Sequence, residues 1–296
     1  MMSAYTYTLI NQLSKHLAFK VTTLEDSTHL QEMQRMSYYT MILITEGEAK
    51  LHAELSTYDV KENELVCLTL YQPFQLVQMQ DCKGFVIHFH PDFFCIYKHH
   101  NEVACNGILF NNIYQPPYHD LSPAETAKLL VLIEQMREEL KEEALAQHEL
   151  LSSYLKIFLI TASRSRLEFT GETRVQGELP EGPFVLQKLK DAIEANFKEK
   201  HSASDYASLL NISAKALAKI TKTHFNKTLT SMISERIISE AKRELYLTSK
   251  PVKAIAFELG FGDEYYFSRF FKNNVNVSPQ VYRSNVGFAR AEGGLN

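Results

Sequence analysis

The sequence has no tryptophan and only four cysteines among its 296 residues. The cysteines, Cys67, Cys82, Cys95 and Cys105, never form the C-x-x-C pair that is typical of zinc sites. The chain also starts without the charged and apolar regions of a secretory signal, which favours a reducing cytoplasm over an oxidising compartment. We therefore expect free, buried thiols that behave as small apolar side chains, with redox sensing by one of them as the alternative.

Long apolar runs and catalytic motifs are absent as well. No stretch approaches the roughly 18 apolar residues that a membrane-spanning helix needs. The sequence holds no phosphate-binding loop, no G-x-G-x-x-G, no G-x-S-x-G and no H-E-x-x-H. These absences argue against a membrane protein and against an enzyme, and we expect no cofactor.

Charge is unevenly divided along the chain. Residues 184–290 carry 17 Lys and Arg against 10 Asp and Glu, whereas residues 1–183 carry 14 against 24. A basic C-terminal part inside an acidic whole favours phosphate neutralisation and salt-sensitive binding to a polyanion. An ordinary solvated surface is the alternative.

The last third of the chain contains one short unit twice. ASLLNISAKALAKITKTHFNKT at 207–228 aligns with AFELGFGDEYYFSRFFKNNVNVS at 256–278 if the second copy has one extra residue in its turn. Each copy predicts a short helix, a tight turn at Asn211 or Gly260, a capping residue at Ser213 or Asp263, and a second helix with cations outside. The sequence thus predicts two helix-turn-helix units. The aligned pairs are Ala207/Ala256, Leu210/Leu259, Asn211/Gly260, Leu217/Phe267, Lys219/Arg269, Lys222/Lys272, Asn226/Asn276 and Thr228/Ser278.

A longer helix is predicted between the two copies. TLTSMISERIISEAKRELYLTS at 228–249 has apolar residues at helical intervals and stops before Pro251, which opens the next helix. A helix of about 20 residues is about 30 Å long, close to the roughly 34 Å of one DNA turn. Such a rod is long enough to hold the second helix of each unit, the reading helix, in successive major grooves.

These residues resemble the AraC/XylS family of bacterial transcription regulators. The most specific part of the resemblance is SKPVKAIAFELGFGDEYYFSRFFKNNVNVSPQVYRS at 249–284, and the whole covers about 184–288. Two features depart from the family pattern: Asn226 and Asn276 replace a glycine after each reading helix, and Thr221 replaces an aromatic residue. Asparagine tolerates a left-handed cap well, whereas Thr221 indicates a thinner first core.

The helix faces predict which side chains meet DNA. Leu217 and Ile220 are expected inside the first reading helix, and Phe267, Phe270 and Phe271 inside the second. The resemblance implies that Lys219 and Arg269 read bases, while Lys222 and Lys272 suit phosphates. A structural role is the alternative for each, above all for the two tyrosines. The outward set is Ala214, Lys215, Ala218, Lys219, Lys222, Glu264, Tyr265, Tyr266, Ser268, Arg269 and Lys272.

The first part of the chain predicts a different module. Short apolar runs over 38–95, broken by turn signals, predict several short strands of a sandwich or small barrel. From 122 onward the period becomes helical, with Ser122 as cap, Pro123 at the first position and Glu125 at the third. We expect an α+β chain: a regulatory and dimerisation domain at 1–169 with a helical hairpin at about 122–169, a linker at 170–183, and an all-α DNA-binding domain at 184–296.

In the family, this first domain is a cupin-like jelly roll that binds an effector, with helices that form a dimer contact. The stripe Leu151, Tyr154, Leu155, Phe158 and Leu159 is one candidate for that contact; packing onto its own domain is the alternative. Arg35, Tyr38, Tyr39, His88 and His90 are candidate effector-binding residues. His88 and His90 share a strand face but lack the acidic ligand and further histidine of a metal-binding cupin, so we expect no metal and favour pocket-facing or half-exposed residues.

The combined prediction is a cytoplasmic, dimeric transcription regulator that binds promoter DNA and responds to a small-molecule effector. RNA polymerase is a further partner if the protein is an activator. The alternative is a DNA-binding protein whose first domain is only a dimerisation or partner-binding platform without a small-molecule ligand.

Overall fold

The computed structural model describes residues 6–11, 15–54, 56–97, 99, 108–170 and 184–286. They form two compact units, which are described separately. Unit 1 takes in residues 1–112 and 116–175, and unit 2 takes in 113–115 and 176–296. The segment that we expected as a linker, 170–183, lies almost wholly outside the described residues. Within the described ranges, no helix is long and apolar enough to cross a membrane.

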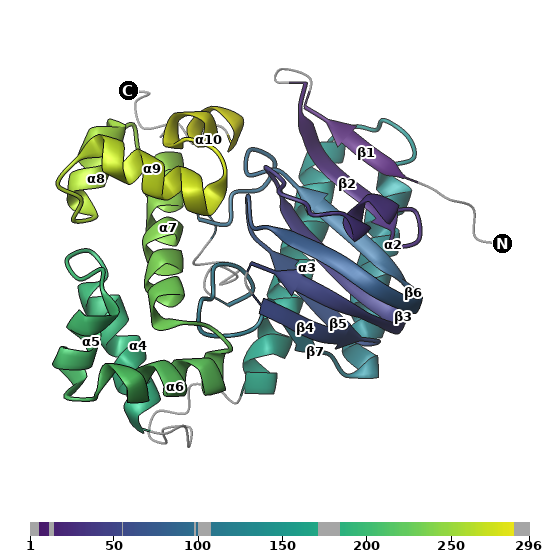
Figure 1. The fold of residues 1–296 in the computed structure, drawn as a ribbon. Coiled ribbons are helices and arrows are strands. Elements are labelled where there is room, and N and C mark those ends of the chain that lie inside the picture. Colours follow the sequence, from purple (N-terminus) through teal and green to yellow (C-terminus); the bar gives the residue numbers. More distant parts are fainter. Residues whose placement is uncertain are drawn as a thin grey trace. The chain divides into compact units, whose positions relative to one another are not determined.

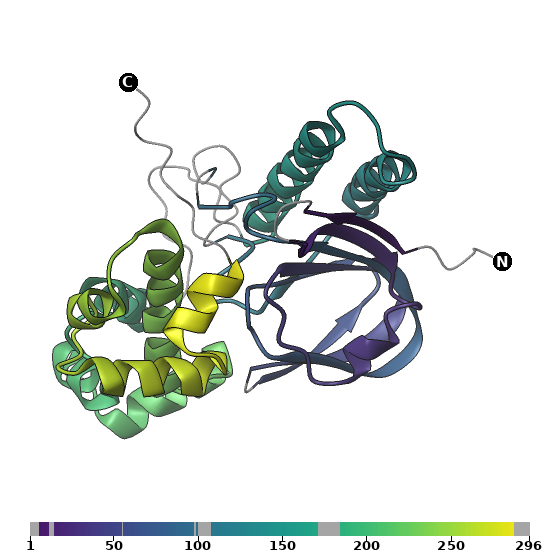
Figure 2. The same cartoon turned by 90° about the horizontal axis from the view of Figure 1, so that it is seen from above.

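Unit 1 is built on one seven-stranded antiparallel sheet (Figure 1). The strand order is β1-β2-β6-β3-β5-β7, with β4 paired to β3, and a short 3-10 helix, η1 (Thr28–Gln31), follows β2. Viewed from above, the strands curve around into a barrel-like wall (Figure 2). The strands are β1 (Tyr7–Ile10), β2 (Leu17–Thr23), β3 (Tyr39–Ala53), β4 (Ser56–Lys61), β5 (Glu64–Leu68), β6 (Phe74–Phe89) and β7 (Tyr118–Asp120).

The expectation of several short strands over 38–95 holds for β4 and β5, with six and five residues, but β3 and β6 are longer, with 15 and 16 residues. They stay continuous by bending, with three register shifts between Ile44 and Lys50. Gly47 lies at this bend with φ of +76°, where an added Cβ would be 2.3 Å from the Gln80 carbonyl oxygen. The strand passes through Gly47 as a bulge and does not end there.

The sheet has two differently packed faces. Ile42, Val66 and Val86 belong to the core enclosed by the curved sheet, together with Leu30 and other apolar side chains. Residues one position along point to the other face, because side chains alternate along a strand. There, Tyr39 and Phe89 stack with ring centroids 4.9 Å apart, and Phe110 contacts both rings.

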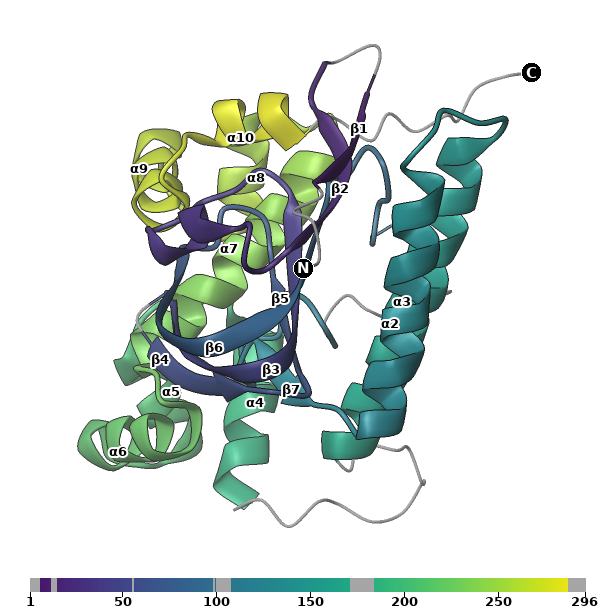
Figure 3. The ribbon, with the colours of Figure 1, turned by 90° about the vertical axis from the view of Figure 1, so that its right-hand side faces the viewer.

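Two helices follow the sheet, α2 (Pro123–Glu139) and α3 (Gln147–Thr170), and they lie side by side (Figure 3). The predicted capping box is confirmed: Ser122 accepts from the backbone N–H of Glu125, whose carboxylate accepts from the backbone N–H of Ser122 at 2.7 Å. The dimer interpretation of the α3 stripe was wrong. Leu151, Leu155, Phe158 and Leu159 are fully buried within the chain, and Tyr154 is partly buried, so packing onto their own unit is the correct alternative.

Unit 2 is helical. Its short helices α5 and α8 each precede a reading helix, α6 or α9, and α7 joins the two pairs. Asn211 and Gly260 both have positive φ, as the predicted turns require. Its helices are α4 (Phe184–Asn196), α5 (Ala203–Leu210), α6 (Ala214–Phe225), α7 (Leu229–Leu247), α8 (Val252–Glu258), α9 (Glu264–Val275) and α10 (Pro279–Val286).

A chain of charged contacts supports α7. Glu240 accepts from Arg243 at 2.6 Å and from Arg236 at 3.2 Å, and Arg236 also pairs with Glu194 of α4 at 2.8 Å. Burial opposes the charged form of Glu240, but these arginines outweigh it and hold its pKa below the ordinary value. The network joins α4 to α7, so it stiffens the support of the reading helices.

Within unit 2, the turn of the second helix-turn-helix unit, at Gly260, packs directly against the loop before α5. A Cβ added at Gly260 would lie 1.9 Å from the Lys198 carbonyl oxygen, and the ring of Phe261 lies 4.9 Å from that of His201. Both helix-turn-helix units therefore share this contact as well as α7.

One short segment was not predicted to belong here. The hydroxyl of Tyr114 donates to Glu194 at 2.8 Å, and its ring lies 6.3 Å from Phe225. Residues 113–115 thus pack within unit 2 although the sequence on both sides belongs to unit 1.

Candidate functional site

The two reading helices begin and end in the same way. Ser213 caps α6 by accepting from the backbone N–H of Ala216 at 3.2 Å, and Asp263 caps α9 by accepting from that of Tyr266 at 2.7 Å. Both helices have 12 residues. Asn226 and Asn276, the predicted departures from glycine, both adopt the left-handed conformation at the C-terminal ends. The repeat in the sequence is therefore a repeat in structure.

The outward face of α6 is small and basic. All five predicted residues are exposed, while Leu217 is buried and Ile220 is only partly buried, so the inward prediction for Ile220 holds in part. Thr221 takes the second inward position instead: it is fully buried, and its hydroxyl donates to the Ala218 carbonyl at 3.1 Å. The exposed five are Ala214, Lys215, Ala218, Lys219 and Lys222.

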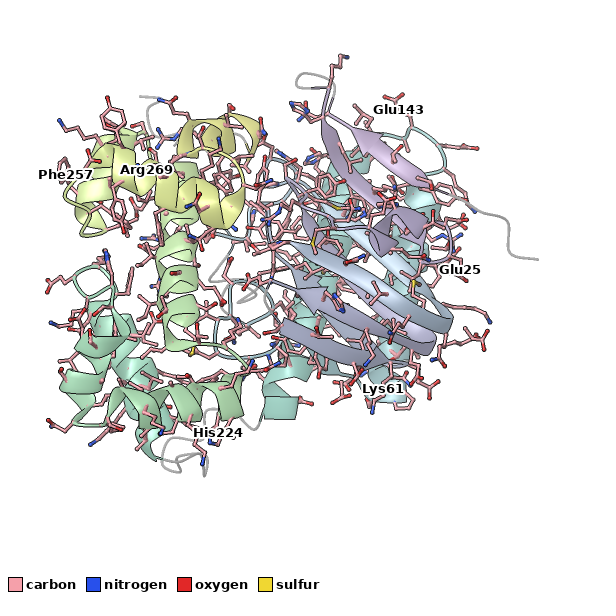
Figure 4. All side chains as sticks on the ribbon, in the orientation of Figure 1. Glu25, Lys61, Glu143, His224, Phe257 and Arg269 are labelled. Atoms are coloured by element: carbon pink, nitrogen blue, oxygen red, sulfur yellow. The ribbon has the colours of Figure 1, made fainter. Side chains whose placement is uncertain are left out.

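The outward face of α9 is aromatic and mixed in charge. Tyr265 and Tyr266 are 78% and 57% exposed, which excludes the alternative that they pack in the core. Arg269 is exposed and projects from α9 (Figure 4), and Lys272 is exposed too. Glu264 and Ser268 are partly buried at the edge of this face.

The inner face of α9 differs from the prediction at one of its three aromatic residues. Phe267 and Phe271 are fully buried, whereas Phe270 is only partly buried and contacts the ring of Phe261 at 5.1 Å.

Cations on the reading helices differ from cations on the support. Arg236, Arg243 and Lys250 all form ion pairs with glutamates. Among the described residues, no ion pair involves Lys215, Lys219, Lys222, Arg269 or Lys272, and Lys222 reaches only the Asn226 carbonyl at 3.5 Å. Within the described chain, these five cations on the reading helices therefore have no intramolecular ion-pair partner that would compete with a bound anion.

Unit 1 contains a polar cluster inside the curved sheet. The Nδ1 atom of His88 lies 3.0 Å from the hydroxyl of Thr40, its partner across β3 and β6. Tyr38 packs edge-on against His88 with ring centroids 4.9 Å apart. His88 is 1% exposed, and burial and nearby cations lower its pKa to about 3, so it is neutral. Two of the five predicted effector residues, Tyr38 and His88, thus meet.

Sequence reasoning missed two members of this cluster. Lys20 on β2 pairs across the ladder with His88, and burial lowers the pKa of its ammonium group. His29, on η1, is close enough that Lys20 lowers its pKa after burial has done so. The only available signal was the alternation of β2 itself, where a lysine at an inward position breaks the pattern LAFKVTT.

The other three predicted effector residues do not join the cluster. Arg35 is exposed, and Tyr39 points to the opposite face of the sheet, against Phe89. His90 follows the end of β6, and its Nδ1 accepts from the backbone N–H of Asp92 at 3.2 Å. The alternative of half-exposed histidines was also wrong, since His88 and His90 are both buried.

Cysteine and metal chemistry find little support in the described parts of the chain. Cys67, Cys82 and Cys95 are free and buried, and Cys105 lies outside the described residues. Burial raises the pKa of the Cys67 thiol to about 12 and that of Cys82 to about 11, which disfavours the reactive thiolate. No group of three or more metal-ligating side chains occurs among the residues that the structure describes.

Comparison with known proteins agrees with the geometry of unit 2. A family model described as a helix-turn-helix domain matches residues 206–285. RafR, the raffinose operon transcriptional regulatory protein of Pediococcus pentosaceus, is 28% identical over 95 residues, which is 32% of this chain and 34% of RafR. The transcriptional activator RhaS of Enterobacter sp. (strain 638) is 28% identical over 159 residues, covering 54% of this chain and 53% of RhaS.

The matches span only about a third to a half of the length of these two relatives. Among solved structures, ToxT from Vibrio cholerae O395 aligns over 96% of this chain and 97% of its own, with 18% identity and a TM-score of 0.40. Residues 206–285 are therefore a helix-turn-helix domain of the kind found in AraC/XylS transcriptional regulators.

Proposed function

We propose that the protein is a sequence-specific DNA-binding transcription regulator that inserts α6 and α9 into successive major grooves of promoter DNA. One observation supports this proposal above the others. The helices α6 and α9 have the same length and the same kind of N-terminal cap, and both carry exposed cations that form no ion pair among the described residues. α7 has 19 residues. It is therefore about 28 Å long, near the roughly 34 Å of one DNA turn. No catalytic step is part of this function.

Individual roles follow from side-chain chemistry. Arg269 suits the O6 and N7 atoms of guanine through its two-pronged guanidinium group, and Lys219 suits the same atoms through a single ammonium group. Lys222 and Lys272, nearer the C-terminal ends, suit phosphates, as do the backbone N–H groups at the starts of the helices. The exposed Tyr265 and Tyr266 supply apolar contacts to base edges. Ala214, Lys215, Ala218, Glu264 and Ser268 complete the contact surface.

Unit 1 is proposed to sense a small-molecule effector inside a cupin-like sheet. The support is the polar cluster of Tyr38, Thr40 and His88, with Lys20 and His29 nearby, beside the apolar core of the sheet, which a mere platform does not require. Binding would shift the two DNA-binding units of a dimer through the linker at 170–183, by an amount set by the effector's differential affinity for the two states. Since promoter DNA is the target, we place the protein in the cytoplasm and, like RhaS, assign it as an activator that contacts RNA polymerase.

A homodimer is part of the proposal, but its contact needs a new location because the predicted stripe is buried. The outer surface of α2 and α3 offers one. Val131 and Ile157 are 60% and 49% exposed there. A shallow groove of about 490 Å³ runs along the same helices, lined by Val131, Glu134, Gln135, Glu138, Glu139 and Tyr154.

Selection of genomic DNA fragments by the full-length protein, sequenced at two salt concentrations, tests the proposal. We expect a shared motif with two half-elements about one helical turn apart, bound more weakly at higher salt. Recovery of fragments no different from random DNA, with and without the segment 1–183, would refute sequence-specific reading. A motif found only with residues 184–296 would instead indicate that unit 1 restrains the intact protein.

A further inference from the structure

The shallow groove along α2 and α3 is strongly acidic. Three of its six lining residues are glutamates, Glu134, Glu138 and Glu139, and they lie beside the exposed Val131. The stretch 131–143 carries five glutamates against two cations, a net charge of −3. Like charges that face each other across an interface oppose binding. The groove therefore does not suit the same groove of a second copy, and it favours a cationic occupant.

The carboxylates of the groove are accessible to such an occupant. Glu134 pairs with Arg137 at 2.9 Å and Glu138 pairs with Lys141, each within one turn of α2. The two glutamate side chains remain 54% and 55% exposed, and ion pairs this exposed contribute little to stability. Among the described residues, no ion pair involves the side chain of Glu139. An incoming cation can therefore approach all three carboxylates from the solvent side.

The reading helix α6 has the charge and the spacing to fill this groove. It carries three lysines and no acidic residue, a net charge of +3 with histidine neutral. Lys215 and Lys219 are four residues apart, as Glu134 and Glu138 are, so each pair spans about 6 Å along its helix axis. Both lysines are exposed and form no ion pair among the described residues. The two helices can thus match two cations to two carboxylates at once.

The other reading helix, α9, is less suited to the groove. On its outward face Tyr265 and Tyr266 are bulky and 78% and 57% exposed, and Glu264 adds a negative charge. The outward face of α6 instead has Ala214 and Ala218 beside its lysines. The distance between packed helices depends on the side chains at the contact, so these alanines let α6 approach closely.

We propose that, in the DNA-free protein, the groove of one copy binds α6 of a second copy. Lys215 and Lys219 pair with Glu134 and Glu138, while the alanines of α6 pack on Val131. The same lysines belong to the surface proposed to meet DNA, so the groove and DNA compete for α6, and self-association restrains DNA binding. This inference rests on the proposed DNA-binding homodimer and names the surface that each copy contributes to its DNA-free form.

Charge reversal on the two sides of the contact tests the proposal in the full-length protein. A groove variant carries Glu134→Lys and Glu138→Lys, and an α6 variant carries Lys215→Glu and Lys219→Glu. In sedimentation velocity at low salt, the wild type should self-associate, and each variant alone should do so at least roughly tenfold more weakly, since each exposed pair contributes a few-fold. An equimolar mixture of the two variants should associate again, because each groove then meets an α6 of opposite charge.

A matched control separates the groove from net charge. Glu25→Lys with Glu32→Lys makes the same charge change at exposed positions outside α2 and α3, and this variant should self-associate as the wild type does. At protein concentrations where the wild type self-associates, the groove variant should bind random duplex DNA roughly tenfold more tightly than this control, because its α6 is released. If circular dichroism shows that the groove variant is unfolded, Glu134→Gln with Glu138→Gln replaces it and should weaken self-association, whereas Glu25→Gln with Glu32→Gln should not.

Four results would overturn the inference. Self-association of the α6 variant alone at wild-type strength would keep a homodimer but reject α6 as the occupant. Equal losses in the groove and control variants would reject the groove. A mixture that associates no more than its components, or a wild type that stays monomeric, would reject the contact itself. The mixing experiment contains no DNA, so sequence-specific reading is decided separately by the selection of genomic fragments.

Discussion

Replacing Gly260 by alanine should disrupt the contact between the turn of the second helix-turn-helix unit and the backbone of Lys198. Gly260 has φ of +79°, and a Cβ there would lie 1.9 Å from the carbonyl oxygen and 3.0 Å from the carbonyl carbon of Lys198. A left-handed conformation costs a non-glycine residue about 1–2 kcal/mol. Since the clash is with backbone, relief requires a main-chain shift of the kind that costs about 1–3 kcal/mol in overpacked cores. Together the two effects predict a loss of about 2–5 kcal/mol.

Urea unfolding of the full chain measures this loss. The sequence has no tryptophan, so circular dichroism is the appropriate signal, and hydrogen exchange of the α8 and α9 amides assigns the change to unit 2. A loss of this size is a large fraction of the roughly 5–15 kcal/mol that stabilises a typical domain. DNA affinity should fall in parallel, because the two reading helices lose one of the contacts that fix their relative position.

Two further variants separate the causes. Gly262→Ala is the matched control: nothing lies within 4 Å of its added Cβ and its φ is not in the left-handed region, so it should change stability by less than about 0.5 kcal/mol. Gly260→Asn introduces the residue that the first helix-turn-helix unit has at the equivalent turn position, Asn211, where φ is 53°. If conformational strain dominates, asparagine restores most of the stability; if the clash dominates, it does not. A loss below about 0.5 kcal/mol in Gly260→Ala would refute the reasoning.

Three other changes probe reading, pH dependence and capping. Arg269→Ala should cost about 1–3 kcal/mol on the preferred DNA site and relax one base position, whereas Lys272→Ala should weaken cognate and random DNA alike; equal losses from both variants in binding titrations would contradict these roles. Because the pKa of His88 falls to about 3 on folding, its contribution is present above pH 6.5 and is lost toward pH 3. The free energy of unfolding of His88→Gln, measured in denaturant titrations, should therefore fall less steeply between pH 6.5 and pH 3 than that of the wild type. The two slopes should differ by about 1.4 kcal/mol per pH unit, and equal slopes would exclude a neutral buried His88. Asp263→Ala should destabilise α9 by about 1 kcal/mol, measured as faster amide exchange at its first turn, with no change at the first turn of α6.

Local features of the fold were readable from the sequence. The capping box at Ser122, the left-handed turn at Asn211 and the caps Ser213 and Asp263 all depend on residues within four positions of one another. Their physics is contained in a short window of sequence, and the duplication supplied the turn and cap predictions of the helix-turn-helix units twice. For the same reason, helical spacing predicted most of the outward faces of α6 and α9, with Ile220, Glu264, Ser268 and Phe270 lying at their edges.

Features that depend on strand pairing were not readable. Tyr38 and Tyr39 are neighbours in sequence, yet only Tyr38 meets His88, because pleating sends Tyr39 to the opposite face. Lys20 joins the same cluster only through the register of β2 against β6, a pairing across 68 positions. The α3 stripe shows the same limit. Its apolar spacing predicts that the stripe is buried, but not whether a second chain or its own unit buries it.

The duplication also has a consequence for the DNA site. Although α6 and α9 share their length and their caps, α6 presents alanine and lysine, whereas α9 presents Tyr265, Tyr266 and Arg269. Different side chains read different bases, so the two half-elements within one chain's site should differ in sequence and follow one another in a fixed order. Exchanging the two half-elements while keeping their spacing should therefore cost as much as scrambling either element, about 1–3 kcal/mol for each mismatched base pair. Competition binding between the native and exchanged sites measures this cost. Equal affinity for the two sites would mean that the two helices do not discriminate bases, and that the free cations alone carry binding.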